Sequence, residues 1–251
     1  MRAFARRYGR PLLTGVVVLL TVAVVAGGVY LGTPHHGTDE SVAAVESNPD
    51  VAVTERDGSY TIEPATGAQS AGLVFYPGGR VHPDAYLAAL APLAAEANVT
   101  VVVPRMPLHL AVLGEGRAGR YVTNGNVQRW YVGGHSLGGA MACRYAAERP
   151  DAVEGVVLYA AYCDRDVSGT GLDALSVTGS ADTVLDSDAY ESNRDNLPAD
   201  ATVRELPLNH SQFGSYRGQR GDSPSNLSYA AAHDRLANVT VSWLRAQRGQ
   251  P

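Results

Sequence analysis

The stretch Gly134-His135-Ser136-Leu137-Gly138 decides the fold predicted for this chain. It follows residues 127–132, which are apolar and β-prone, and precedes residues 137–148, which are rich in alanine and have a helical period. Ser136 is therefore expected at a tight turn between a strand and a helix, with its hydroxyl pointing out above a sheet. A chance match is the alternative in a chain with 27 glycines, but the strand before and the helix after disfavour it.

The chain on both sides of this turn alternates between apolar strands and helices. Strands are predicted at residues 72–76, 99–103, 127–132, 153–160, 174–178 and 202–206, and helices at residues 83–97, 137–148, 186–196 and 228–247. Such alternation is typical of a mostly parallel sheet with helices on both faces. Residues 51–54 and 60–63 are expected to add a hairpin at one edge. The connection between residues 160 and 174 is too short for a lid domain, so an open site is expected.

A histidine and an aspartate follow Ser136 at the ends of later strands. A serine hydroxyl needs a neighbouring base to take its proton, and this base is usually a histidine oriented by a carboxylate. His210 follows the last predicted strand and Asp182 follows the strand before it, so both are expected at the same edge of the sheet as Ser136. Ser136 is thus the candidate nucleophile, His210 the base and Asp182 the acid. The alternatives for the acid are Asp164, Asp166, Asp186 and Asp188, and those for the base are His35, His36, His82, His109, His135 and His233.

Two backbone N–H groups are the candidate oxyanion hole. The charge that develops on an acyl oxygen needs preorganised donors. Leu137 directly follows the nucleophile at a helix N-terminus, so its N–H is one candidate. The second is Gly79, in Tyr76-Pro77-Gly78-Gly79-Arg80, where small residues let the backbone approach a substrate. A plain turn is the alternative for this segment. Arg80 and Arg105, each just past a strand, suggest weakly that the substrate is anionic, although solvated surface arginines are the simpler explanation.

Four ordered motifs resemble the small single-domain α/β-hydrolases of the fold-5 group. They are Tyr76-Pro77-Gly78-Gly79-Arg80-Val81, residues 103–112, Gly133-Gly134-His135-Ser136-Leu137-Gly138-Gly139-Ala140, and Asn209-His210-Ser211-Gln212-Phe213-Gly214 with Gln219-Arg220-Gly221-Asp222. The resemblance covers about residues 70–245. It implies an α/β-hydrolase fold with Ser136, Asp182 and His210 as the triad, and it names no substrate. Such proteins often carry lysine where Arg80 and Arg105 stand.

The N-terminus has the pattern of a membrane anchor. A basic segment, residues 1–11, precedes residues 12–31, which carry no charge and are long enough to cross a bilayer as a helix. The basic flank is expected to stay in the cytoplasm, so the rest of the chain would lie outside it on a single-pass membrane protein. Cleavage after Val24-Val25-Ala26 would instead release a secreted protein. Residues 32–50, with His35 and His36, are predicted as a linker, and residues 51–251 as the hydrolase domain.

Composition narrows the function further. The net charge of −5 indicates no excess of basic residues for binding nucleic acid, so nucleic acid is not an expected partner. All 20 basic residues are arginine, which excludes lysine-based chemistry. Outside the cytoplasm Cys143 and Cys163 could form a disulfide, and this pairing is left open. Cys143 is expected two turns down a helix and Cys163 at the upper end of the next strand, so their separation is predicted to exceed disulfide reach.

The expected function is that of a membrane-anchored serine hydrolase acting on a small ester or related acyl compound. No metal or other cofactor is expected, and the oligomeric state is left open. A catalytically idle domain that binds an envelope ligand or partner is one alternative, although the complete set of three reacting groups argues against it. An acyltransferase that uses the same three residues is another.

Overall fold

The computed structural model describes residues 20–22, 27–28, 32–66, 71–123 and 127–249. The chain divides into two units, Met1–Pro34 and His35–Pro251. The membrane helix predicted at residues 12–31 lies largely outside the described residues. Among the described helices, none combines the length and the apolar character needed to span a bilayer. The second unit contains the sheet and every predicted site residue.

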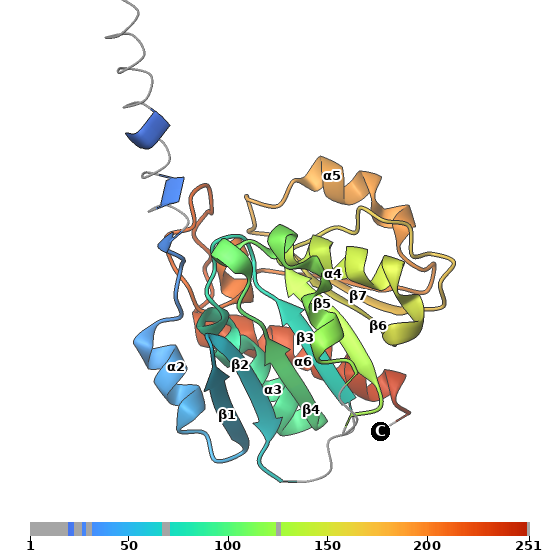
Figure 1. The fold of residues 1–251 in the computed structure, drawn as a ribbon, viewed down its shortest axis with the longest axis horizontal. Helices are drawn as coiled ribbons and strands as arrows, with labels where there is room; N and C mark the ends of the chain where they lie inside the picture. Colours follow the sequence, from blue (N-terminus) through green and yellow to red (C-terminus); the bar gives the residue numbers. More distant parts are fainter. Residues whose placement is uncertain (1–19, 23–26, 29–31, 67–70, 124–126, 250–251) are drawn as a thin grey trace, which may run out of the picture. The chain divides into compact units, whose positions relative to one another are not determined.

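The second unit is built on an eight-stranded sheet in the order β1-β2-β4-β3-β5-β6-β7-β8 (Figure 1). Strand β2 is antiparallel to both of its neighbours, and β4, β3, β5, β6, β7 and β8 are parallel to one another. The strands are β1 (Val51–Arg56), β2 (Ser59–Pro64), β3 (Ala71–Tyr76), β4 (Val99–Val103), β5 (Trp130–His135), β6 (Gly155–Tyr159), β7 (Asp173–Gly179) and β8 (Thr202–Leu206). The mostly parallel α/β sheet predicted from the sequence is confirmed.

Helices cover both faces of this sheet. They are α2 (Asp39–Glu46), α3 (Leu87–Ala97), α4 (Leu137–Glu148), α5 (Ser187–Ser192) and α6 (Tyr229–Gln247). Short 3₁₀ turns join them: η1 (Pro83–Tyr86), η2 (Pro107–His109), η3 (Ala111–Leu113), η4 (Glu115–Arg120), η5 (Pro150–Ala152), η6 (Arg194–Asn196) and η7 (His210–Phe213). Helices α3 and α6 pack against each other on one face, and α4 covers the other face over β3, β5 and β6. The helical layers predicted from the sequence are therefore present.

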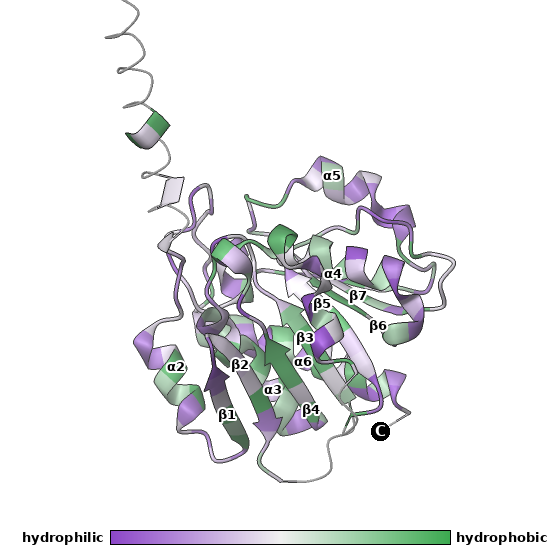
Figure 2. Cartoon of the chain, viewed as in Figure 1, coloured by the Kyte–Doolittle hydropathy of each residue, from purple (hydrophilic) through white to green (hydrophobic). Residues whose placement is uncertain are grey.

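The core has two parts because strand side chains alternate between the faces. Leu73 and Phe75 of β3 belong to the cluster that includes α3 and α6, whereas Val74 and Tyr76 belong to the cluster that includes α4. Burial on both faces explains why β3 and β4 are continuous apolar runs, visible in green in Figure 2. The edge strands are more polar, with Glu55 in β1 and Arg204 and Glu205 in β8 exposed.

Several element boundaries differ from the predictions by a few residues, and one helix was not predicted. Strand β5 starts at Trp130 and continues through Gly133 and Gly134 to His135, because both glycines pair with β3 on one side and β6 on the other. The segment predicted as a linker, residues 32–50, contains helix α2. Thr38 caps this helix by accepting a hydrogen bond from the Ser41 N–H, and Val45 is buried. From His35 on, the predicted linker is part of the folded unit.

Cys143 and Cys163 form a disulfide, with their Cα atoms 5.5 Å apart. The predicted separation beyond disulfide reach was wrong. After β6 the chain turns back along α4 instead of remaining at the upper edge of the sheet, and Arg144 of α4 forms an ion pair with Asp164. Cys163 therefore lies beside the turn of α4 that carries Cys143, in the same core cluster.

Candidate active site

Ser136 lies in the turn between β5 and α4 with a backbone conformation of φ 53° and ψ −125°. This region is unfavourable for residues other than glycine, and such conformations persist only where the surroundings hold them. The Ser136 N–H donates to the Tyr159 carbonyl of β6 at 2.9 Å. A Cβ atom on Gly138 would clash with the Tyr76 carbonyl oxygen, and one on Gly134 would lie 2.5 Å from Gly138 C. The glycines of the motif thus allow the close approach of β3, β5 and α4 that positions the serine.

His210 and Asp182 form a buried pair at the same edge of the sheet. Asp182 follows β7, and His210 begins η7 after β8. Nδ1 of His210 is 2.8 Å from Oδ2 of Asp182, and the two side chains are 3% and 1% exposed. The other Asp182 oxygen accepts the N–H groups of Val184 and Leu185 at 2.8 and 3.0 Å. A carboxylate on Nδ1 holds the proton at that nitrogen and leaves Nε2 to act as an acceptor.

The pKa of Asp182 is lowered despite its burial. Desolvation of the carboxyl raises its pKa, but the hydrogen bond and charge of His210 and the two backbone N–H groups together outweigh this effect. Asp182 is thus ionised near neutral pH, as an orienting carboxylate must be.

The turn that carries His210 is fixed by a second aspartate, Asp222. Its Oδ1 accepts the His210 N–H at 3.0 Å, and its Oδ2 accepts the N–H and the hydroxyl of Ser211 at 2.9 and 2.5 Å. A capping box between Asn209 and Gln212 closes the same turn. Asp222 lies in one of the quoted motifs, yet its anchoring role has no signal in the sequence alone.

The predicted oxyanion donors lie together beside Ser136. In the segment 78–81, the N–H of Gly78 donates to the Tyr86 hydroxyl, that of Arg80 to the His109 carbonyl and that of Val81 to the Gly78 carbonyl. Among the described residues no backbone hydrogen bond from the Gly79 N–H is present, so this N–H is the donor of the segment that a ligand can use. A Cβ atom on Gly79 would be 3.5 Å from Cδ2 of Leu137, so the two predicted residues are neighbours.

Two small cavities flank Ser136. One, of about 170 Å³, contains both predicted oxyanion residues and His210 in its lining, together with Tyr216 and Gln219. The other, of about 240 Å³, is lined mainly by apolar side chains: Leu137, Ala140, Ala160, Ala161, Tyr162, Val184 and Leu185, with Asp186. Ser136 and His210 thus face a common space, but no hydrogen bond joins their side chains in the described part of the chain. Such contacts often tighten only when substrate binds.

The two arginines predicted to bind substrate are not among the residues that line these cavities. Arg105 lies against Gly58 in the turn between β1 and β2, and its N–H donates to the Ser59 hydroxyl at 3.0 Å. Arg80 has a left-handed backbone with φ 59°. The structure places Gln219 and Tyr216 at the site instead. Both follow His210 in an irregular segment, where the sequence contains no periodicity that would have singled them out.

His135 is buried directly behind the base. Its ring centroid is 4.4 Å from that of His210, and its Nδ1 is 2.9 Å from the Tyr86 hydroxyl. Burial, and then the charge of His210, lower the pKa of His135 well below 6.5, so His135 is neutral at physiological pH.

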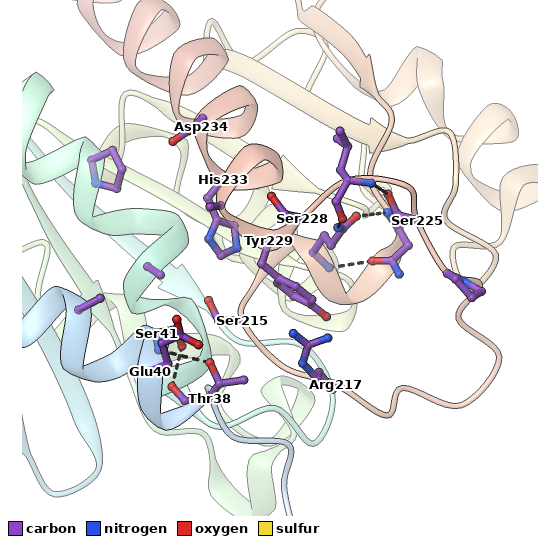
Figure 3. A pocket seen from close by; sticks show the side chains of 18 residues that line it. Thr38, Glu40, Ser41, Ser215, Arg217, Ser225, Ser228, Tyr229, His233 and Asp234 are labelled. Atoms are coloured by element: carbon purple, nitrogen blue, oxygen red, sulfur yellow. Dashed lines mark hydrogen bonds between the residues drawn. The ribbon is translucent and has the colours of Figure 1, made fainter.

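A larger cavity lies elsewhere, between α2, α3 and the start of α6 (Figure 3). It has a volume of about 700 Å³, and Arg217 lies over the ring of Tyr229 at one side of it, 4.7 Å from the ring centroid. None of the three predicted triad residues lines it. Cavity size alone therefore does not identify the reactive site in this protein.

Comparison with known proteins agrees with the fold. The model of the Alpha/beta hydrolase family matches residues 72–234, well over half of the chain. This chain belongs to the alpha/beta hydrolase family. Among solved structures, it resembles a protein described as a predicted CIB-like hydrolase from Thermoplasma acidophilum, with a TM-score of 0.56 and 16% sequence identity. That similarity covers 78% of this chain and 99% of the other, and it concerns the fold. No curated protein gives a significant sequence match.

As an alpha/beta hydrolase, the chain has its candidate site where this fold presents reactive groups. The matched region begins in β3 and ends in α6, so it includes the turn at Ser136 and the segments that carry Asp182 and His210. The resemblance inferred from the sequence motifs is confirmed, and a hydrolase is the activity that the family supports.

Proposed function

We propose that this protein is a serine hydrolase that cleaves a small ester or related acyl compound through an acyl-enzyme on Ser136. The observation that carries the proposal is the pairing of His210 with Asp182 at 2.8 Å, with His210 lining the same cavity as Ser136. In this mechanism His210 takes the Ser136 proton as the hydroxyl attacks the acyl carbon. It then returns the proton to the leaving group, and Asp182 stabilises the imidazolium that forms between these steps.

The two cavities suggest how a substrate binds. The oxyanion would lie between the N–H groups of Gly79 and Leu137. These two donors stabilise the negative charge that develops on the acyl oxygen as the tetrahedral intermediate forms. The leaving group must be within reach of His210, which protonates it, so it belongs in the smaller cavity. The acyl chain then belongs in the apolar cavity beside Ala140 and Ala161. Both cavities are smaller than the pockets of about 300–1,000 Å³ that hold drug-sized ligands, which favours short acyl groups.

Labelling with a fluorophosphonate probe and hydrolysis of p-nitrophenyl esters test this proposal. The purified full chain should label at Ser136 and should hydrolyse acetate and butyrate esters faster than long-chain esters. Ser136→Ala should abolish both reactions, and Asp182→Asn should lower kcat by about 10⁴-fold, because the histidine would be held in the wrong tautomer. A folded wild-type chain that neither labels nor turns over any ester would refute the proposal.

We also propose that residues 12–31 anchor the hydrolase unit to a membrane, with this unit on the outer side. The basic segment followed by an uncharged apolar run supports the anchor, and the Cys143–Cys163 disulfide supports an oxidising compartment. Protease treatment of intact cells should degrade the domain, while the protein should sediment with membranes. Recovery of an intact chain in the soluble cytoplasmic fraction would contradict both parts of this proposal.

A further inference from the structure

Three potential metal ligands meet at a place that lies outside the cavities beside Ser136. Nδ1 of His36 is 2.7 Å from Oδ2 of Asp84, and Nδ1 of His82 is 3.0 Å from the same oxygen. All three ligand atoms lie within 4.8 Å of one another. The rings of His36 and His82 stack with their centroids 4.3 Å apart. His36 comes from the segment before α2, whereas His82 and Asp84 come from the segment after β3.

The backbone holds these two segments in register. The His35 N–H donates to the Arg80 carbonyl at 2.7 Å, and the His82 N–H donates to the His35 carbonyl at 2.8 Å, which forms a short parallel bridge. The Gly37 N–H donates to Oδ1 of Asp84 at 2.9 Å. This bond orients the carboxylate so that Oδ2 faces both imidazoles, as the hydrogen bonds around metal-binding carboxylates commonly do.

The chemistry of the three groups suits a first-row transition metal ion. Two imidazoles and a carboxylate are ligands that zinc accepts in tetrahedral sites, where ligand distances of about 2.0–2.1 Å place the ligand atoms about 3.3 Å apart. The His36–Asp84 and His82–Asp84 separations are slightly shorter than this, so small side-chain rotations would admit an ion. The His36 side chain is 55% exposed, and those of His82 and Asp84 are 15% and 14% exposed. The site is thus mostly buried at His82 and Asp84 and open to solvent at His36, where a water molecule can be the fourth ligand of a tetrahedral ion.

We propose that His36, His82 and Asp84 bind one Zn²⁺ ion at a site separate from the Ser136 centre. In the sequence His36 belongs to a predicted linker, and only the fold brings it to the other two ligands. The ion would join the chain before α2 to the segment that carries Gly79, three residues before His82. In this position it would hold the oxyanion segment in place, away from the cavities beside Ser136.

Zinc titration of the full chain, purified without a histidine tag and freed of metal by a chelator, tests the site. The wild-type chain should bind one Zn²⁺ per molecule with micromolar or tighter affinity and should melt at a higher temperature when zinc is present. Co²⁺ in its place should give the visible absorption of a tetrahedral ion. His36→Ala and Asp84→Asn should each weaken zinc binding at least ten-fold and remove the zinc-dependent rise in Tm.

His35→Ala is the matched control, because this neighbouring histidine contacts the Arg217 carbonyl through Nδ1 and lies outside the ligand set. It should bind zinc as the wild type does. Circular dichroism and a cooperative thermal transition report whether each variant is folded. Equal affinity in the wild type and in His36→Ala, loss of binding in His210→Ala instead, or no binding at micromolar zinc would overturn the proposal. In the last case the cluster is a metal-free pair of imidazoles that share the Asp84 carboxylate.

Discussion

The Tyr86 hydroxyl joins the base region to the oxyanion segment through two hydrogen bonds. It accepts the Gly78 N–H at 2.9 Å and lies 2.9 Å from Nδ1 of His135. Tyr86 is fully buried, so removal of its hydroxyl leaves both partners without a replacement from water. The backbone before Gly79 would then be free to move away from the position that an oxyanion requires.

We expect Tyr86→Phe to lower kcat by about 10- to 100-fold. Removal of one oxyanion donor lowers kcat by about 10²–10³-fold, and a displaced donor should cause part of this loss. Tyr159→Phe is the matched control, since its buried hydroxyl bonds to Thr240 at 2.6 Å, in the core cluster beneath the site. Steady-state kinetics of both variants on a short p-nitrophenyl ester would show the difference. Equal losses of kcat in the two variants would mean that the Tyr86 hydrogen bonds stabilise the core and do not position the oxyanion segment.

At this scale the sequence predicts which groups come together at one edge of the sheet better than it predicts which side chains line the cavities there. Ser136, Asp182 and His210 can be found because each follows a strand, and the ends of parallel strands meet at one edge. Arg80 and Arg105 follow strands too, but the direction of a side chain depends on the local backbone, which is left-handed at Arg80. Position along a strand therefore predicts proximity to the site, and does not predict which side chains face the substrate.

At the scale of elements, the disulfide joins α4 to the segment that follows β6. It closes a loop with a sequence separation of 20 residues. A loop of this length is expected to stabilise a fold by about 3 kcal/mol through restriction of the unfolded chain. Urea denaturation should therefore show a loss of about 2–4 kcal/mol when dithiothreitol is added. The Cys143→Ala, Cys163→Ala double variant should show the lower stability with and without the reductant, and an unchanged midpoint on reduction of the wild type would contradict the prediction.

Elements were predictable where the sequence has a clear local period. Helix α4 and strand β8 have the predicted bounds, since a continuous period determines them. Helix α2 was missed because it is short and half of its residues are polar, with Val45 as its buried side chain. The path of the chain after β6 was also missed, because residues 160–164 have no period and their course depends on tertiary contacts with α4. Local patterns carry no information about such contacts.

At the scale of the whole molecule, buried neutral histidines make stability depend on pH. Burial lowers the pKa of His135 and of His233 below 6.5, their usual value when unfolded. As the pH falls below 6.5, the unfolded chain binds protons at these positions while the folded protein does not. Unfolding thus takes up protons, and acid favours it.

We expect the free energy of unfolding to fall between pH 7.5 and pH 5, by at most about 1.4 kcal/mol per pH unit for each histidine. Urea denaturation at several pH values would measure the slope. His233→Gln can keep a donor near the Gly214 carbonyl, which His233 now contacts at 2.9 Å, and it should give a shallower slope than the wild type. A free energy that is constant over this range, or one that rises towards acid, would contradict the assignment of neutral buried histidines.

The charged residues of the two edge strands affect whether the protein aggregates at high concentration. In the sheet that the described residues form, β1 and β8 are the edge strands, and the open backbone groups of an edge strand can recruit a strand from another molecule. Both edge strands carry exposed charged side chains: Glu55 and Arg56 in β1, and Arg204 and Glu205 in β8. These side chains would lose their hydration if a strand of another molecule paired with the edge. Crowded molecules should therefore resist aggregation through sheet extension, and replacement of these charges by valine should promote fibril formation at high concentration.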